Sequence, residues 1–213
     1  MIDYERVSKF ISLVLRHKPE AAKLTVDKYG YANVAELVSY LNKRFGGFTE
    51  TDLDVIVTTD DKQRYSYNED HTKIRAVQGH SIKVELELVE QKPPELLYHG
   101  TAEKYIPSIM EQGLIPKQRQ YVHLSNNTFT AHKVGQRHGG RTYICVVAAQ
   151  LMYEHGYKFY LAENGVWLTD KVPVKYLTPC LVTDENEAKS LAVMLGEYDK
   201  YFEYHPYKDS LSE

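Results

Sequence analysis

The chain has 213 residues, a formal net charge of −3 and an apolar fraction of 43%, an ordinary composition for a globular protein. No apolar run approaches the ~20 residues that a membrane span requires, and the first residues lack the basic start and apolar core of a signal peptide. We therefore expect a cytoplasmic protein without a membrane span. The only cysteines are Cys145 and Cys180, too few for a disulfide framework or a cysteine-rich metal site.

The charge is divided unevenly along the chain. Residues 179–213 contain 3 Lys and Arg against 8 Asp and Glu, a balance of −5, which leaves +2 for residues 1–178. Binding along an extended nucleic-acid backbone would call for a basic stripe. We therefore expect a small phosphate pocket built from a few arginines, rather than a long basic groove.

The first part of the chain predicts helices. Apolar residues recur at helical spacing over 7–15, and Pro19 stops the pattern. Asn33 followed by Glu36 resembles a capping box, which begins a second helix that ends near Gly46.

A third helix and a hairpin follow. Thr49 is positioned to cap a short helix, Tyr65 and Tyr67 alternate with polar residues, and a turn at 68–70 leads into a returning strand at 74–77. Three helices followed by a hairpin is the order of a winged helix. The periodicity alone equally allows another small α+β domain.

The second part of the chain reads as a mixed lobe. Residues 83–88 alternate like a half-exposed strand, and 91–94, with two prolines, form the best linker in the sequence. Short strands are predicted at 96–98, 122–125, 142–147, 158–161 and 165–168, and helices near 103–112 and 129–137. The expected fold class is α+β, with domains at 1–92 and 93–178 and an acidic extension at 179–213, in which 188–195 could form a helix.

Polar side chains that suit a phosphate gather in two segments of the first lobe. Arg16 and His17 end the first helix just before a chain reversal. The segment 75–81 sets a guanidinium, an amide, an imidazole and a hydroxyl around a glycine, a donor cluster that phosphate oxygens favour. These side chains belong to Arg75, Gln78, His80 and Ser81, and Lys73 lies on the same strand face as Arg75.

Three polar strand ends in the second lobe suggest a second ligand. His99, Gly100 and Thr101 follow an apolar strand start, and the glycine would let a ligand approach the backbone closely. The segments 119–125 and 163–168 also carry polar residues at the ends of apolar strands. Tyr98 and Tyr121 are expected to wall this pocket, and Trp167 to pack in the core.

At these motifs the sequence resembles the RNA 2′-phosphotransferase family, that is, tRNA 2′-phosphotransferase and its bacterial relatives, across residues 4–177. The matching stretches are 12–17, 61–65, 74–82, 98–101, 119–125 and 164–170. The resemblance implies an N-terminal winged-helix lobe, a C-terminal ADP-ribosyltransferase-like lobe, NAD as co-substrate and no metal. It also implies an RNA partner that bears an internal 2′-phosphate. We expect a monomer, and tRNA splicing is the family's known task.

The resemblance also implies roles for particular residues. It maps an Arg-His-Arg-Arg phosphate set onto Arg16, His17, Arg75 and Arg137, with Arg141 as the competing candidate for the last place. The NAD-binding residues that it implies are His99, Gly100, Thr101, His123, Ser125, Asn164 and Val166. The residues expected to contact the RNA and its phosphate are Lys62, Arg64, Lys73, Gln78, His80 and Ser81.

Val166 stands where many ADP-ribosyltransferases have a glutamate. A carboxylate there would repel an attacking phosphate of nearly −2 charge, which valine avoids. The implied reaction transfers the 2′-phosphate to NAD through an ADP-ribosylated RNA and releases nicotinamide, 2′-hydroxyl RNA and ADP-ribose 1″,2″-cyclic phosphate. Two other hypotheses are a non-catalytic winged-helix nucleic-acid binder and an ADP-ribosyltransferase that leaves the ADP-ribose on its target.

Overall fold

The computed structural model of the protein describes residues 2–197, which form two compact units. The first unit contains residues 2–88 together with Lys117–Gln120 and Ala162–Asn164. The second contains the remainder of the described chain. The mixture of helices and small sheets confirms a fold of mixed α and β type. The domain boundaries expected at 92 and 178 stay predictions.

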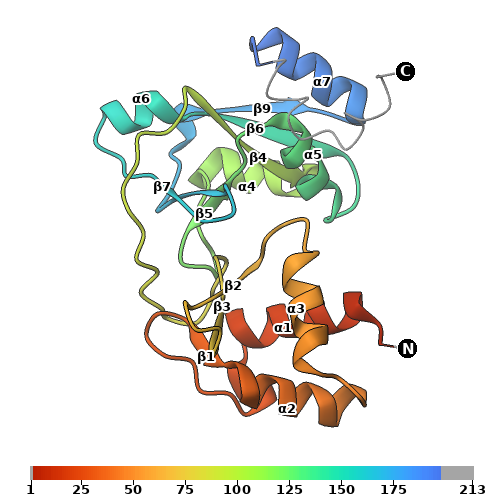
Figure 1. The fold of residues 1–213 in the computed structure, drawn as a ribbon. Coiled ribbons are helices and arrows are strands. Elements are labelled where there is room, and N and C mark those ends of the chain that lie inside the picture. The colour runs from red at the N-terminus through yellow and green to blue at the C-terminus, as the bar shows by residue number, and fades with distance from the viewer. Residues whose placement is uncertain (1, 198–213) are drawn as a thin grey trace, which may run out of the picture. The chain divides into compact units, whose positions relative to one another are not determined.

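The first unit alternates helices with short strands (Figure 1). Its elements are α1 (Tyr4–Arg16), the 3₁₀ helix η1 (Pro19–Ala22), β1 (Tyr31–Asn33), α2 (Val34–Phe45), α3 (Glu50–Thr58), β2 (Tyr65–Tyr67) and β3 (Lys73–Ala76). The three predicted helices and the hairpin are confirmed. The strand β1 was not predicted from the sequence, because three residues are too few to show alternation.

Side-chain caps explain where these helices begin. The Asn33 side chain accepts a hydrogen bond from the Glu36 backbone N–H at 3.0 Å and starts α2. Thr49 and Asp52 form a complete capping box at α3, in which the Asp52 carboxylate accepts from the Thr49 N–H at 2.8 Å. Such caps satisfy backbone N–H groups that the first helical turn leaves without partners.

The antiparallel sheet of the first unit has the order β1-β3-β2, so β3 is its central strand. Ile74 and Ala76 of β3 are fully buried, and between them Arg75 points to the other face. The core beneath the sheet is built from the apolar stripes of α1, α2 and α3. The alternation on β3 therefore holds a guanidinium on the face away from the core.

The second unit is built from two small antiparallel sheets and their covering helices (Figure 1). Its elements are β4 (Leu96–Ala102), η2 (Glu103–Tyr105), α4 (Ile106–Gln112), β5 (Val122–Leu124), α5 (Thr128–Gln136), β6 (Thr142–Ala148), α6 (Ala149–Glu154), β7 (Tyr160–Leu161), β8 (Trp167–Thr169), η3 (Val174–Tyr176), β9 (Leu177–Leu181) and α7 (Glu185–Met194). The sheet orders are β4-β6-β9 and β5-β8-β7.

Each face of the β4-β6-β9 sheet packs against a different layer. Tyr98, Ile144 and Val146 on one face pack with residues of α5 and α7. Figure 1 shows these two helices beside the sheet. Leu97 and the alternate residues of β6 on the other face pack with α4, α6 and the second sheet, where Trp167 lies in the core as expected. The two sheets meet where Tyr98 and Ser125 exchange backbone hydrogen bonds of 2.9 and 2.7 Å.

Four parts of the chain differ from the sequence expectation. Residues 83–88 form no strand, because the segment finds no ladder and makes isolated contacts, such as the Glu85 N–H to the Lys28 carbonyl at 2.7 Å. The strand β9 and the helix α6 were not expected. Tyr98 does not wall a pocket: it is fully buried, and its hydroxyl donates to the Glu197 carboxylate.

The extension beyond residue 178 is described as far as residue 197. Within it, α7 covers most of the helix expected at 188–195 and buries Ala188, Leu191 and Ala192 against α5. The later acidic stretch lies outside the described residues. None of the helices within residues 2–197 has the length and apolar character to cross a membrane.

Candidate phosphate and dinucleotide sites

The last residue of α1 carries a buried guanidinium. Arg16 lies at the helix end, and its Nε and Nη2 have no hydrogen-bond partner among residues 2–197. Burial is the main cause that lowers the pKa of Arg16 to about 10; Arg119 and Arg64 act in the same direction, and Tyr65 and Asp60 oppose them. A cation that is desolvated, unpaired and close to other cations is an unfavourable arrangement until an anion binds.

His17 is held beside this guanidinium by the segment that follows β3. Its Nδ1 hydrogen-bonds the Ser81 hydroxyl at 2.9 Å, and the Ser81 backbone N–H donates to the Arg16 carbonyl at 2.9 Å. Burial, followed by the charges of Arg16 and Arg119, lowers the pKa of His17. The ring is therefore neutral near pH 7, and an incoming phosphate dianion would raise that pKa again.

His80 is a second histidine of this cluster, and it is almost fully buried. Both of its ring nitrogens lack hydrogen-bond partners among the described residues. Burial lowers its pKa to about 4, and the charges of Arg16, His17 and Arg75 act in the same direction. The folded protein thus keeps His80 neutral well into the acidic range.

The depressed pKa of His80 predicts a loss of stability in acid. Between pH ~6.5 and pH 4 the unfolded chain binds a proton that folded His80 does not, so stability falls as the pH falls, by roughly 2 kcal/mol at pH 5. No such contribution exists above pH ~6.5. Urea unfolding at pH 7 and pH 5 should show this loss in the wild type and a smaller one in His80→Gln. The exposed His71→Gln serves as control, and an equal pH dependence in all three proteins contradicts the prediction.

Arg75 is engaged on several sides within the first unit. Its Nη2 donates to the Glu163 carboxylate at 2.5 Å, its Nε lies 3.4 Å from the Ser66 hydroxyl, and the guanidinium stacks over the Tyr31 ring at 4.7 Å. Nη1 is buried without a partner among residues 2–197. The two N–H groups of Nη1 therefore remain for a ligand, and Glu163 already balances the charge of Arg75.

The other cations expected to contact RNA already have acidic partners or backbone neighbours. Arg64 forms an ion pair with Asp60, and Lys73 pairs with Asp27 at 3.2 Å. The Lys62 carbonyl accepts a hydrogen bond from the Asn164 side chain at 3.1 Å. Asn164, expected on the NAD side, thus belongs to the first unit through this contact.

Arg119 is the member of the cluster that sequence reasoning assigned to no role. Its segment, Lys117–Gln120, belongs to the first unit, where the Gln120 N–H donates to the His80 carbonyl at 3.2 Å. Its charge acts on both Arg16 and His17. The only signal in the sequence was that Arg119 opens a stretch shared with the family.

Within the first unit the structure brings together most of the residues expected to bind the phosphate, including Arg75, whose charge acts on His80; the places of Arg137 and Arg141 in the second unit stay predictions. Arg16, His17, Ser81 and His80 come together as expected, with Gln78 in the same segment and its Oε1 buried without a partner among the described residues. Arg64 and Arg119 supply the neighbouring guanidinium groups. Arg137 is the exposed C-cap of α5 in the second unit, and Arg141 pairs with Glu103 at 3.5 Å.

In the second unit, two histidines meet between neighbouring strands. The Nδ1 of His99 lies 3.0 Å from the His123 carbonyl, which can only accept, so this nitrogen carries the proton. In a neutral ring Nε2 is then the acceptor, suited to a ribose hydroxyl. Ser125 lies next to this pair through its bridge to Tyr98, and Val166 is half-buried just before β8.

Two other residues expected at the dinucleotide site, Gly100 and Thr101, pack against the helix α5. Gly100 faces α5 so closely that a Cβ would lie 1.6 Å from the Ala131 carbonyl oxygen. The helix backbone therefore fills the space on the Cβ side of this glycine, and a ligand contact to the Gly100 backbone stays a prediction. Thr101 is buried beside the same helix, against Gly135.

The two cysteines and the side chains that could bind a metal add no reactive site within the described residues. Burial raises the pKa of Cys145 to about 12 and also raises that of Cys180, so both are poor nucleophiles at neutral pH. Within residues 2–197 no group of three His, Cys, Asp or Glu side chains is arranged to hold a metal ion.

Comparison with known proteins identifies the family. A family model described as "RNA 2'-phosphotransferase, Tpt1 / KptA family" matches residues 3–171. The chain is 52% identical over 171 residues to a protein of Flavobacterium johnsoniae, with 80% of this chain and 93% of the relative covered. It is 50% identical over 172 residues to one of Fusobacterium nucleatum (81% and 96% covered) and 49% identical over 171 residues to one of Escherichia coli (80% and 92% covered).

All three relatives are named "Probable RNA 2'-phosphotransferase". The family match ends at residue 171, before β9 and α7. It spans the cationic cluster and the His99–His123 pair. The chain belongs to the RNA 2′-phosphotransferase, Tpt1 / KptA family.

Proposed function

We propose that this protein is an NAD-dependent RNA 2′-phosphotransferase that removes an internal 2′-phosphate from RNA. The observation that carries the proposal is the buried guanidinium of Arg16, whose Nε and Nη2 lack partners within residues 2–197 and whose charged neighbours include Arg64 and Arg119. A phosphate dianion satisfies both needs, because it supplies hydrogen-bond acceptors and opposite charge.

The phosphate-binding residues that we propose are Arg16, His17, Arg64 and Arg119, with Ser81 and His80 beside them. The His17–Ser81 hydrogen bond fixes the imidazole, and the three guanidinium groups oppose the charge of the phosphate. Arg75, whose charge acts on His80, is proposed to contact the phosphate through its Nη1, and Gln78, Lys62 and Lys73 are proposed to contact the RNA around it. Arg137 and Arg141 stay secondary candidates for the phosphate set.

NAD is proposed as the second substrate of the reaction, bound by the second unit. His99 suits it because its acceptor nitrogen can take a hydrogen bond from a ribose hydroxyl. His123, Ser125 and Val166 complete the proposed contacts of this unit, together with the backbone of Gly100 and Thr101. NAD supplies the electrophilic anomeric carbon of its nicotinamide ribose, with nicotinamide as the leaving group.

The proposed reaction has two steps. A 2′-phosphate oxygen attacks the anomeric carbon, the glycosidic bond breaks and nicotinamide leaves, which gives an ADP-ribosylated RNA. The 2″-hydroxyl of the attached ADP-ribose then attacks phosphorus. The bond between phosphorus and the RNA 2′-oxygen breaks, and that oxygen takes a proton. The products are RNA with a 2′-hydroxyl and ADP-ribose 1″,2″-cyclic phosphate. The guanidinium groups oppose the charge that builds on the phosphate oxygens in the second step.

Val166 supports a phosphate as the attacking group. A carboxylate at this position would repel the phosphate dianion, whereas a valine adds no charge beside it. A phosphate also requires no strong general base, since its second ionisation lies near pH ~6. Positioning and charge compensation are therefore the main tasks of the site.

The order of elements supports the proposed lobes. The first unit runs α1-β1-α2-α3-β2-β3 around a small antiparallel sheet, which suits a winged helix, and the second unit's two small sheets suit an ADP-ribosyltransferase-like lobe. We propose domains at 1–92 and 93–178 on this basis, and a cytoplasmic monomer. A tRNA splice-junction phosphate is the proposed class of substrate.

The proposal is tested by incubating the protein with NAD and an oligonucleotide that carries one internal 2′-phosphate. Nicotinamide, 2′-hydroxyl RNA and a cyclic phosphate of ADP-ribose should appear in equal amounts, and the same oligonucleotide with a 2′-hydroxyl should give none. A nucleic-acid binder would release no nicotinamide. Retention of ADP-ribose on the RNA as the final product would support an ADP-ribosyltransferase instead.

A further inference from the structure

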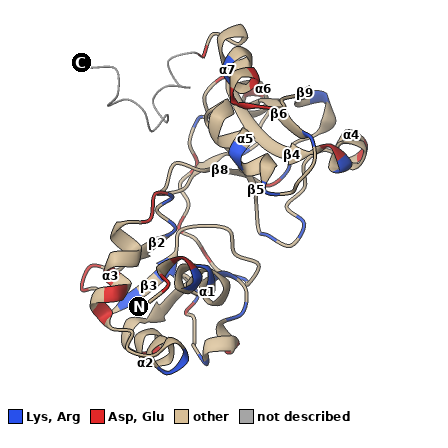
Figure 2. Ribbon diagram, turned by 90° about the vertical axis from the view of Figure 1, so that its right-hand side faces the viewer, with Lys and Arg blue, Asp and Glu red and all other residues tan. Residues whose placement is uncertain are grey.

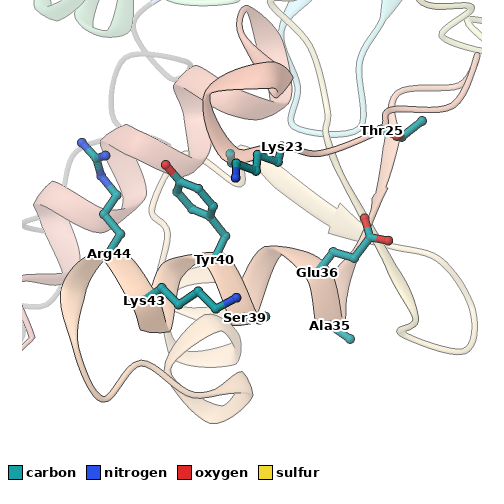
Figure 3. A pocket seen from close by; sticks show the side chains of 9 residues that line it. Lys23, Thr25, Ala35, Glu36, Ser39, Tyr40, Lys43 and Arg44 are labelled. Carbon is teal, nitrogen blue, oxygen red and sulfur yellow. The ribbon is translucent and has the colours of Figure 1, made fainter.

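An open groove of about 770 Å³ lies on the first unit (Figure 3). Its two sides are the end of η1 with the following chain, and one face of α2. Figure 3 shows Lys23, Lys43 and Arg44 around the same hollow as Tyr40. Three cations and one acidic residue, Glu36, line it, so the groove carries excess positive charge.

The lysines of the groove have no acidic partner within residues 2–197. The ammonium groups of Lys23 and Lys43 are exposed, and neither pairs with a carboxylate among residues 2–197. Lys23 closes η1 in the left-handed region, at φ 55°, which sets the direction in which its side chain leaves the backbone. By contrast, Lys9, Lys28 and Lys73 of the same unit are each paired with an acid.

Arg44 and Tyr40 line the basic end of the groove and are held in place by packing on α1. The two are one helical turn apart on α2 and both pack on Phe10 of α1, with Arg44 4.4 Å above the Phe10 ring and Tyr40 stacked on it at 5.8 Å. A guanidinium placed over an aromatic ring leaves N–H groups available to donate to a phosphate.

The charge on the neighbouring helix is of the opposite sign. The helix α3 carries Glu50, Asp52 and Asp54 and no lysine or arginine, whereas α2 ends in Lys43 and Arg44, as the red and blue segments of Figure 2 show. In helix-turn-helix proteins the second helix of the motif usually approaches the nucleic acid. Here its acidity would repel a phosphodiester backbone, and the face of α2 would attract it.

We propose that this groove, defined by Lys23, Tyr40, Lys43 and Arg44, binds the phosphodiester backbone of the RNA substrate at nucleotides next to the modified one. The inference rests on the proposed function, because an RNA with a 2′-phosphate is taken as the substrate. Lys23 follows Arg16 by one short 3₁₀ helix that packs on α1, so the same unit presents the phosphate cluster and the groove.

The size of the groove limits how much RNA it holds. Its α2 wall from Glu36 to Arg44 is roughly 12 Å long at ~1.5 Å per residue. That length matches two or three phosphates of a strand, at roughly 3.4 Å or more per nucleotide. Glu36 and Thr25 lie at the end away from Arg44 (Figure 3), where the acidic side chain would stop the strand.

The test compares a trinucleotide and a 20-nucleotide RNA, each with one internal 2′-phosphate, in the wild type and in Lys23→Gln/Lys43→Gln. Losing two phosphate contacts should reduce the slope of log K against log salt for the long RNA by roughly 1.4, and should weaken its binding ~5-fold at low salt. The ratio of kcat/KM for long over short RNA should fall by a similar factor. Lys9→Gln, an exposed lysine on α1 outside the groove, is the matched control.

The outcomes separate this inference from the proposed function. If the wild type releases nicotinamide from NAD with the trinucleotide, the proposed function holds whatever the groove does. A wild-type salt slope and length ratio in the double variant would then overturn the groove as an RNA site and leave the surface to another partner. The inference would also be overturned if Lys9→Gln reduced the salt slope by as much as the double variant does, since any surface lysine would then contribute equally.

Discussion

Replacing Arg119 by glutamine is expected to lower kcat/KM for 2′-phosphate removal by roughly 100- to 1000-fold. The charge of Arg119 acts on both Arg16 and His17 in the folded protein, so it lies where the phosphate is proposed to bind. Removing one preorganised donor from a site where charge develops costs roughly 3–4 kcal/mol of transition-state stabilisation. Single-turnover kinetics with a 2′-phosphorylated oligonucleotide and saturating NAD measure the loss.

Arg137→Gln is the matched control, because it removes the same group at the position that the resemblance favoured. Arg137 is the exposed C-cap of α5, and we expect its loss to lower the rate much less than the loss of Arg119. The reverse order of effects would return the fourth phosphate ligand to Arg137. Arg119→Lys retains the charge but not the planar fork, and should recover part of the activity.

The same variants report on the step that the cluster serves. If the guanidinium groups act mainly when charge builds at phosphorus, Arg119→Gln and Arg75→Ala should accumulate ADP-ribosylated RNA, because the first attack is slowed less than the second. Gel separation of the RNA species in the single-turnover reaction shows the intermediate directly. Equal slowing of both steps would mean that these residues only bind the substrate.

Helices of the first unit could be predicted because their signals are local. The apolar stripe of α1 and the caps at Asn33 and Thr49 lie within a few residues of the structure that they specify. The β2-β3 hairpin was equally readable from its turn. The strand β1 was not, since its three residues become a strand only by pairing with β3.

The predictions for β9 and for residues 83–88 were wrong for opposite reasons: β9 was not predicted, and 83–88 was predicted as a strand. Residues 83–88 alternate well but find no ladder, so the pattern alone was misleading. The strand β9 contains Pro179, which cannot donate to a ladder, but β9 pairs on one side only, with β6, where such a residue is tolerated at the sheet edge. Both outcomes depend on contacts far apart in sequence, which periodicity does not contain.

The same limit explains the site. Arg16, His17 and Ser81 were predicted because they stand in short polar motifs, and the structure brings them together. Arg119 comes from a turn of irregular chain, and its membership of the first unit depends on long-range contacts such as that of Gln120 with His80. The small phosphate pocket stays a prediction, and the groove on α2 could not be predicted because its lining comes from separate elements.

The second large effect is expected for Gly100→Ala, which should destabilise the protein by about 3 kcal/mol or more. A Cβ on Gly100 would lie 1.6 Å from the Ala131 carbonyl oxygen and 2.8 Å from the Gly135 nitrogen. These are backbone atoms of α5, which cannot turn aside as a flexible side chain would, so the helix itself must shift. Urea unfolding at pH 7 measures the loss.

The control Gly139→Ala adds the same methyl group where nothing lies within 4 Å, at a φ of +67°. It should cost only roughly 1 kcal/mol, from the left-handed backbone. If Gly100 instead served to admit a ligand, Gly100→Ala would be no less stable than Gly139→Ala and would lose only NAD binding. A large loss of stability places the glycine's role in packing, where it holds β4, and with it His99, against α5.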